Sequence, residues 1–139
     1  MPAILEQKRA AFALEKVELA NKGGQKAKFK TQLVKLPARL HNNGLGQTVA
    51  FYLAAGDGKP EVEICGWLEQ WLRDGDGAVY RDPAGGRLID WITGKADTFG
   101  GTKHDPALLY RHASAEARAL AAWLKRFAEA FLEGDAAND

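Results

Sequence analysis

The chain has 139 residues and a mass of 15.1 kDa, close to the commonest size of one domain, so a two-domain enzyme is not expected. Hydrophobic residues make up 46% and charged residues 27%, which excludes mainly disordered, collagen-like and membrane-spanning chains. Nineteen basic and eighteen acidic side chains give a net charge of +1, so the charge balance identifies no partner. We expect a single domain over residues 1–139.

The composition favours helices. Alanine and leucine together number 40, whereas isoleucine and valine number nine. We therefore predict an all-α fold, a compact bundle of about five to six helices. The first helix is expected from Ala10, with Ala13, Val17 and Ala20 on its apolar face and Gly23-Gly24 at its end.

Two helices are predicted on either side of Asn42-Asn43-Gly44. The earlier one has an apolar stripe at i, i+4, i+7 and i+11, and Pro37 predicts a kink or break in it near Leu36. The later one is expected from about Leu45 to Ala55, before the turn at residues 56–58. The stripe of the earlier helix consists of Phe29, Leu33, Leu36 and Leu40, and that of the later helix includes Val49 and Leu53.

The next helix is expected to start at Pro60 and to end at the Asp-Gly repeats of residues 74–77. Residues 74–103 carry seven glycines, so only a short helical piece around Leu88 to Thr93 is predicted there. The apolar side of the helix after Pro60 is formed by Ile64, Trp67, Leu68, Trp71 and Leu72.

The last helix has the longest apolar repeat. Asp105 and Pro106 resemble an N-cap followed by proline at the first helical position, although Ser114 offers a second possible start. The tail, residues 134–139, is expected to fray. The stripe expected to pack on the bundle consists of Ala113, Ala117, Leu120, Leu124, Phe127 and Phe131.

The basic residues are unevenly distributed. Between Leu19 and Gly56 the sequence contains no Asp or Glu. Lys28, Lys35 and Arg39 share one helical stripe there, and such a region attracts phosphate within about 10 Å. In the last helix the outward cations are Arg118, Lys125 and Arg126, joined by Arg111 if the helix is continuous through His112. These six positions, Lys28, Lys35, Arg39, Arg118, Lys125 and Arg126, are the candidate nucleic-acid contacts.

Catalytic patterns are sparse. The three histidines form neither a metal-protease pattern nor a pair with a nucleophilic serine, and a lone Cys65 within an apolar helix is more typical of a core residue. Gly44-Leu45-Gly46-Gln47-Thr48 has no lysine of a phosphate-binding loop, and the Asp-Gly repeats lack the ligand spacing of a calcium loop. We expect no enzyme activity, no cofactor and no metal.

The cellular setting follows from what the sequence omits. A lone cysteine cannot form an internal disulfide, which fits a reducing compartment. The chain has no run of about 18 apolar residues, and its first residues are charged too early for a secretory signal. We expect a cytoplasmic protein without a membrane partner. Trp67, Trp71 and Trp123 are interpreted as packing residues in preference to base-stacking platforms.

Two segments resemble one known family. Leu36-Pro37, followed after six residues by Gly44-Leu45-Gly46-Gln47-Thr48-Val49-Ala50-Phe51, is similar to the signature of the small subunit, the fifth Cmr protein, of type III-B CRISPR effector complexes. Tyr110-Arg111, Ala115-Glu116-Ala117 and residues 123–128 resemble that family's C-terminal helix. The likeness covers roughly the first and last thirds of the chain.

The resemblance implies an all-helical, non-catalytic subunit that stacks with copies of itself inside a guide-RNA-directed complex. Its implied partners are the other Cmr subunits and the guide and target RNA backbone. Another subunit cuts the target RNA in that family, and guide pairing supplies the sequence specificity. Gln47 and Tyr110 are implied to be corner and packing residues.

Two other functions remain open from the residues alone. A free-standing helical DNA-binding protein would need a recognition helix with base-reading side chains and would normally form a dimer. A small helical hydrolase would need a pocket that holds a nucleophile and a base. Sequence-dependent duplex binding would favour the first, and turnover in clean preparations the second.

Overall fold

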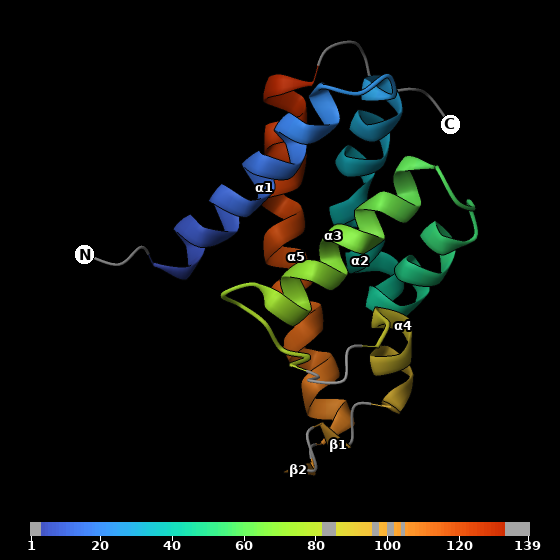
Figure 1. Cartoon of the computed structure of the whole chain (residues 1–139), viewed down its shortest axis with the longest axis vertical. Helices are drawn as coiled ribbons and strands as arrows, with labels where there is room; N and C mark the ends of the chain where they lie inside the picture. Colours follow the sequence, from blue (N-terminus) through green and yellow to red (C-terminus); the bar gives the residue numbers. More distant parts are fainter. Residues whose placement is uncertain (1–3, 82–85, 96–97, 100–101, 104, 133–139) are drawn as a thin grey trace.

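The computed structural model describes residues 4–81, 86–95, 98–99, 102–103 and 105–132 (Figure 1). These residues form five α-helices, one short π-helix and two strands of two residues each. In chain order the elements are α1 (Leu5–Asn21), α2 (Lys26–Leu53), α3 (Pro60–Asp74), α4 (Leu88–Asp90), the π-helix η1 (Trp91–Lys95), β1 (Thr98–Phe99), β2 (Thr102–Lys103) and α5 (Pro106–Phe131). The prediction of an all-α fold is confirmed.

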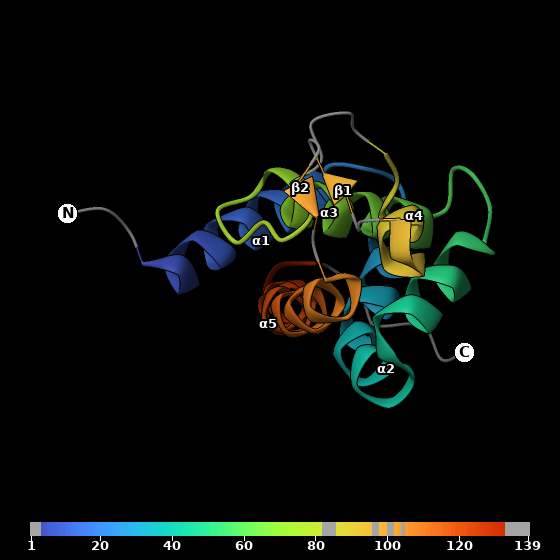
Figure 2. The ribbon, with the colours of Figure 1, turned by 90° about the horizontal axis from the view of Figure 1, so that it is seen from below.

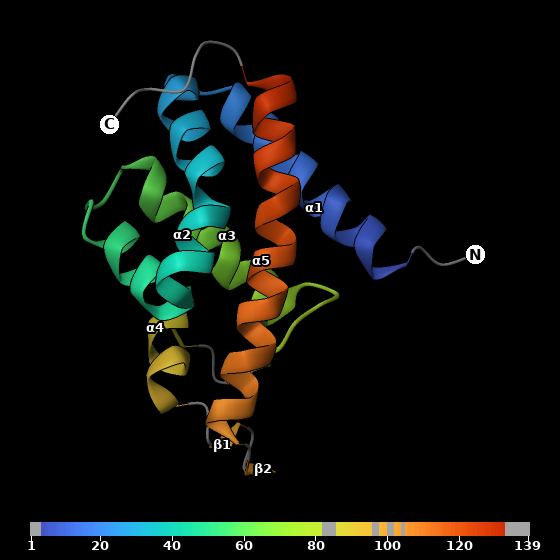
Figure 3. The same ribbon diagram turned by 180° about the vertical axis from the view of Figure 1, so that it is seen from behind.

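The helices form two layers. Helices α2 and α5 lie side by side, as Figure 3 shows from behind. Helix α1 packs against α5 and helix α3 against α2, so both cover the same face of this pair (Figure 2). The N-terminal end of α1 projects beyond the bundle in Figure 1. The opposite face of the α2–α5 pair therefore faces outward.

The core lies between the two layers and follows the predicted stripes. Phe29, Leu33, Leu36 and Leu40 of α2 are buried, as are Ala113, Ala117, Leu120 and Leu124 of α5. Each buried leucine contributes about 1.5–3 kcal/mol to folding. The apolar side of α3 is also buried as expected, with Trp67 stacked on Phe29 at a ring-centroid distance of 5.4 Å. Trp67 and Trp71 are thus core residues.

The predicted stripe of α5 fails at its C-terminal end. Phe127 is half-buried and Phe131 is 52% exposed, so the expectation that both pack on the core is wrong for Phe131. Ala128 and Leu132 are buried at this end of the helix, so the buried face runs through these positions and Phe131 lies to its side. The predicted period of the stripe therefore departs from the buried face in the last turn.

Helix α2 is interrupted at Gly44, and its backbone stays helical at Pro37. Only Gly44 has non-helical backbone angles inside α2, with φ 83° and ψ 166°. Of the kink or break predicted near Leu36, the break is therefore wrong. A proline inside a helix removes one backbone hydrogen bond and costs about 3 kcal/mol. Because Leu33, Leu36 and Leu40 are buried on either side of it, their packing offsets this cost.

The half of α2 after Gly44 buries Val49 as predicted, but not Leu53. Leu45, Thr48, Val49 and Tyr52 are buried, whereas Leu53 is 40% exposed. Buried positions at i, i+3, i+4 and i+7 are one helical face, and Leu53 lies to its side. The expectation that Leu53 belongs to the core is wrong, because Tyr52 takes that position.

The ends of α1 and α5 are set by local hydrogen bonds. Helix α1 begins at Leu5, earlier than predicted, and the backbone N–H of Ile4 donates to the Gln7 side chain at 3.1 Å. The carboxylate of Asp105 caps α5 by accepting from the backbone N–H groups of Ala107 and Leu108. Helix α5 is continuous through Ser114, so the alternative start there is wrong.

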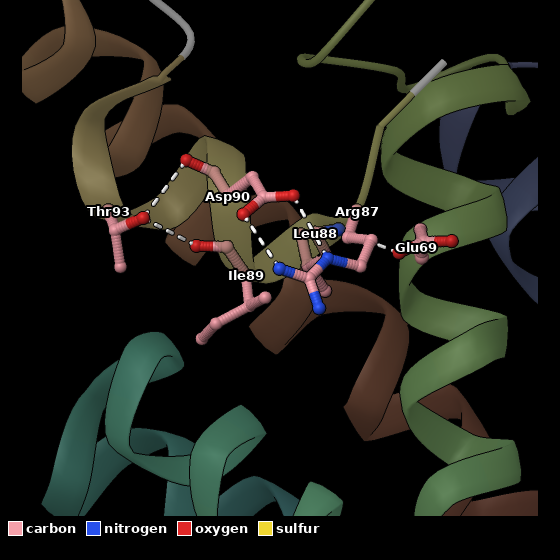
Figure 4. A network of polar contacts seen from close by, with 6 residues as sticks. All are labelled: Glu69, Arg87, Leu88, Ile89, Asp90 and Thr93. Atoms are coloured by element: carbon pink, nitrogen blue, oxygen red, sulfur yellow. Dashed lines mark hydrogen bonds and ion pairs between the residues drawn. The ribbon is translucent and has the colours of Figure 1, made fainter.

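The middle segment contains the short helical piece that was expected near residues 88–93. Figure 4 shows how α3 anchors it: a carboxylate oxygen of Glu69 accepts from the backbone N–H of Leu88 at 2.6 Å. Arg87 and Asp90 form a paired ion contact, and the Thr93 hydroxyl donates to the backbone oxygen of Ile89. Leu88 and Trp91 then enter the core. This segment therefore packs as part of the bundle.

Some predictions concern residues that the structure does not describe. The frayed tail, residues 134–139, and the histidine at position 104 lie outside the described part of the chain, as does part of the glycine-rich segment.

Candidate nucleic-acid interface

The single cysteine of the chain lies in the core. Cys65 is buried, and burial, with a smaller effect of Glu69, raises the pKa of its thiol to about 12. It is therefore a protonated core residue at neutral pH, as predicted. The described residues include no cluster of His, Cys, Asp and Glu side chains that could hold a metal ion. Among the described helices, none combines the length and apolar character that crossing a bilayer requires.

Lys28 is exposed at the edge of a groove between α2 and α3. The groove has a volume of about 360 Å³, and its lining includes Gln32, Lys59 and Glu61. We call it the α2–α3 groove. Lys28 makes no ion pair within the described part of the chain. Lys35, the next cation along the stripe, is half-buried and already interacts with a group in this chain.

Arg39 is held in place by neutral groups. Its guanidinium donates hydrogen bonds to the side-chain oxygen of Gln32 and to the Tyr52 hydroxyl, the latter at 3.1 Å. It also lies over two rings, 5.1 Å from the centroid of Phe51 and 5.4 Å from that of Tyr52. None of these partners is a carboxylate, so the positive charge is oriented without being neutralised.

Tyr52 connects Arg39 to the backbone of α2. Its hydroxyl donates to the backbone oxygen of Gln32 at 2.9 Å while it accepts from Arg39. Burial raises the pKa of Tyr52, although the hydrogen bond from Arg39 opposes that rise. The phenol therefore stays protonated at neutral pH and acts as a fixed donor to Gln32. The result is a cation that keeps one geometry on the surface of α2.

The cations of α5 lie elsewhere. Arg118 and Arg126 are exposed and Lys125 is half-buried, and they form no ion pair within the described residues. Arg126 lines a groove of about 350 Å³ between α1 and α5, together with Arg9 and Trp123. We call it the α1–α5 groove. Lys28 and Arg126 therefore line two different grooves.

The corner at Gly44 is locked against α5. The Tyr110 hydroxyl accepts a hydrogen bond from the backbone N–H of Gly46 at 3.0 Å. A Cβ atom at Gly46 would come within 3.2 Å of the Ile92 side chain and 3.4 Å of the Tyr110 hydroxyl, which explains the small residue. Tyr110 is thus the corner and packing residue that the resemblance implied. Gln47 lies at the same corner but is exposed, so the packing role is wrong for it.

The sequence patterns did not single out Phe51, which is 61% exposed beside Arg39. The helical period of the sequence does indicate that Phe51 faces outward. The buried face through Leu45, Val49 and Tyr52 leaves position 51 on the outside of the helix. Membership of a motif says nothing about which face of the helix a residue occupies, so the motif alone could not reveal this ring.

A comparison with protein-family models matches residues 5–131 to the family described as CRISPR-associated protein (Cas_Cmr5). The chain belongs to the Cmr5 family. Membership implies a small subunit of the type III-B Cmr effector complex, which in this family is generally non-catalytic. A search of curated proteins finds no match to the chain.

The family assignment covers all of the described helices. The match runs from the first residue of α1 to the last residue of α5, so it includes the middle segment that carried no resemblance in the sequence.

Proposed function

We propose that this Cmr5-family subunit binds the backbone of the target RNA inside the effector complex and stacks there with copies of itself. It holds the RNA strand without sequence preference and leaves cleavage to another subunit, in cytoplasmic defence against foreign nucleic acid. Base pairing with the guide RNA supplies the specificity. The observations that carry the proposal are the exposed cations that form no ion pair among the described residues, such as Lys28 and Arg126, and the guanidinium of Arg39, whose hydrogen-bond partners are neutral.

The charge of α2 supports this function. Residues 20–56 contain no Asp or Glu, so the positive potential of Lys28, Lys35 and Arg39 is not cancelled by neighbours on their own helix. The guanidinium of Arg39 is oriented in advance by Gln32 and Tyr52, which lowers the entropic cost of binding a phosphate. Unneutralised surface cations that keep a fixed geometry are typical of backbone recognition.

The second group of cations supports the same function on α5. Arg118, Lys125 and Arg126 lie along one helix, and Arg126 faces the α1–α5 groove. Two separate positive regions fit an extended strand that passes over the subunit better than a compact ligand in one pocket. The six contacts, Lys28, Lys35, Arg39, Arg118, Lys125 and Arg126, are the proposed RNA-binding residues.

Stacking with copies of the chain is supported by apolar side chains at the two ends of α5. Leu108 is 41% exposed near its start and Phe131 is 52% exposed at its end. Helix α5 runs along the length of the molecule in Figure 1, so these side chains lie at opposite ends. Two different surfaces at opposite ends are what head-to-tail association requires.

The test uses the assembled effector complex and two triple variants. One carries Lys28→Glu, Lys35→Glu and Arg39→Glu, and the other carries Arg118→Glu, Lys125→Glu and Arg126→Glu. Target-RNA affinity is measured over a range of salt concentrations. Each lost phosphate contact lowers the salt slope of single-strand binding by about 0.7, so each variant should lower it by about 2.

A charge reversal on a surface without RNA contacts serves as the control. The variant Lys8→Glu alters a lysine of α1 that lies 3.5 Å from Asp76, and it should leave the slope unchanged. If both triple variants bind with the wild-type slope, the proposed RNA contacts are rejected. Sequence-dependent binding of duplex DNA by the purified chain would instead favour a DNA-binding function.

A further inference from the structure

The outer side of the α2 bend carries an aromatic ring that the proposed backbone contacts do not use. Phe51 is 61% exposed, the second most exposed large apolar side chain among the described residues. It lines a groove of about 490 Å³ with three amide side chains, Asn42, Asn43 and Gln47. We call this the elbow groove. The bend at Gly44 brings the end of one helical half, with Asn42 and Asn43, beside Gln47 and Phe51 of the other.

The ring of Phe51 lies next to the Arg39 guanidinium. The Arg39 guanidinium lies 5.1 Å from its centroid and is itself bound to Tyr52 and Gln32. A cation over an aromatic ring is an attractive contact, so it restrains the ring while much of the ring stays exposed to solvent. Burial of such a ring would stabilise the protein by about 25 cal/mol for every Å² of apolar surface removed from water. A ligand that covers the ring recovers this free energy.

The lining of the elbow groove matches the parts of a nucleotide. An aromatic ring stacks on any base, and the amides of Asn43 and Gln47 offer both donors and acceptors to base edges. Arg39, directly beside the ring, supplies a positive charge for the adjoining phosphate. Single-stranded RNA is commonly bound by this combination of ring, amide and cation.

We propose that the elbow groove holds one unpaired base of a single-stranded RNA, stacked on Phe51, with its phosphate next to Arg39. The proposal rests on the proposed function, because it places a base contact beside backbone contacts already assigned to the same strand. Stacking accepts every base, so it adds affinity and positions the strand without adding sequence specificity. Each subunit would then hold one base at the bend of α2, and the distance between subunits would set how many nucleotides lie between the stacked bases.

The chemistry of the lining favours RNA over a protein partner. An apolar protein surface would leave three amides to be paired, since Phe51 is the one apolar side chain that lines the groove among the described residues. A single ring among amides offers little apolar area for a protein contact, which normally has a wider hydrophobic centre. The neighbouring charge is positive, in a stretch of α2 without acidic residues, as suits a polyanion.

The test uses the purified full-length chain and a single-stranded oligouridine of about 12 nucleotides with one 2-aminopurine. Uridines stack weakly, so stacking of the 2-aminopurine on Phe51 should quench its fluorescence. Phe51→Ala should remove the quenching and weaken binding by about tenfold, the loss expected for one stacked base. Phe51→Tyr keeps a ring and should retain both. Leu53→Ala, an exposed apolar neighbour on the same helix, should change neither.

The outcomes separate this inference from the function it rests on. If Phe51→Ala binds and quenches like the wild type while the triple variant of Lys28, Lys35 and Arg39 loses affinity, the stacking site is rejected and the backbone contacts stand. If the wild-type chain and the assembled complex both bind RNA independently of these cations, both proposals fail. If Phe51→Ala alters self-association and not RNA binding, the ring belongs to a protein contact and the inference is overturned.

Discussion

Glu116 is the most highly connected charged residue of the described core. Its carboxylate accepts two hydrogen bonds from Arg9, at 2.6 and 2.8 Å, and one from the Trp71 indole at 2.8 Å. Three helices, α1, α3 and α5, are joined at this point. A Cβ atom at Gly77 would lie 2.6 Å from the carboxylate, so the turn after α3 also closes over it. Glu116 therefore links α5 to α1 and α3, the two helices that cover one face of the α2–α5 pair.

The ionisation of Glu116 gives a pH-dependent prediction. Burial alone would raise the pKa of this carboxyl, but the hydrogen bonds from Arg9 and Trp71 and the charge of Arg9 together lower it below its ordinary value of 4.5. The ionised form therefore stabilises the fold above that pH, and this contribution is lost as the pH falls through the lowered pKa. Glu116→Gln should reduce the free energy of unfolding by about 2 kcal/mol at pH 7.

Urea unfolding at pH 7 and at pH 3 measures this effect. The difference between the wild type and Glu116→Gln should shrink at the lower pH, because the carboxyl of the unfolded wild type takes up a proton below its ordinary pKa of 4.5 and the ionised form then stabilises the fold less. Glu129→Gln, on an exposed position of the same helix, should change stability by less than about 0.5 kcal/mol at both. A pH-independent difference for Glu116→Gln would contradict the assigned ion pair.

Some of these residue positions follow from the sequence and others do not. Cys65 is flanked by an apolar helical face, so its burial is a matter of local period. Arg9, the ion-pair partner of Glu116, is 107 residues away in the chain, and no local pattern connects the two. The same limit applies to Arg39, whose contact with Tyr52 depends on how α2 bends.

At the scale of elements, most helices begin or end at the capping, proline or glycine residues that the sequence displays. Asp105 and Pro106 start α5, Pro60 starts α3, and the glycines after α1 follow its last turn. These ends depend on backbone chemistry within a few residues, which the sequence displays directly. Pro37 misleads because its cost is offset by the buried leucines around it, and that packing is not local.

Two glycine-to-alanine substitutions, one at the bend of α2 and one inside α3, are expected to change stability in opposite directions. Gly44 has φ 83° and ψ 166°, a conformation that costs about 1–3 kcal/mol for a residue with a Cβ atom, so Gly44→Ala should destabilise the protein by about that amount. Gly66 lies inside α3 without a positive φ, and a Cβ atom added to it would meet no described atom within 4 Å. Gly66→Ala should therefore stabilise by up to about 1 kcal/mol.

Thermal or urea unfolding of the two variants measures both effects. Because the substitutions are chemically identical, general effects of an added methyl group cancel in the comparison. A destabilising effect of the same size at both positions would show that the conformation of Gly44 is not what matters.

At the scale of the whole molecule, the two-layer arrangement decides which cations can act together. The sequence predicts the basic stripes of α2 and α5 separately, because each depends only on helical period. Their relative placement depends on how the layers pack, and it puts Lys28 in the α2–α3 groove and Arg126 in the α1–α5 groove. An RNA strand bound as proposed therefore contacts two regions of each subunit, with the elbow groove as a third contact.

The central claim is that target RNA lies on the outward cations of this Cmr5-family subunit, and lysine footprinting of the assembled complex tests it most directly. The rate of amine acetylation at each lysine is measured by mass spectrometry with and without bound target RNA. RNA should slow the modification of Lys28, Lys35 and Lys125 several-fold and leave Lys8, which pairs with Asp76, unchanged. Equal rates at all four lysines in the presence and absence of RNA would contradict the account.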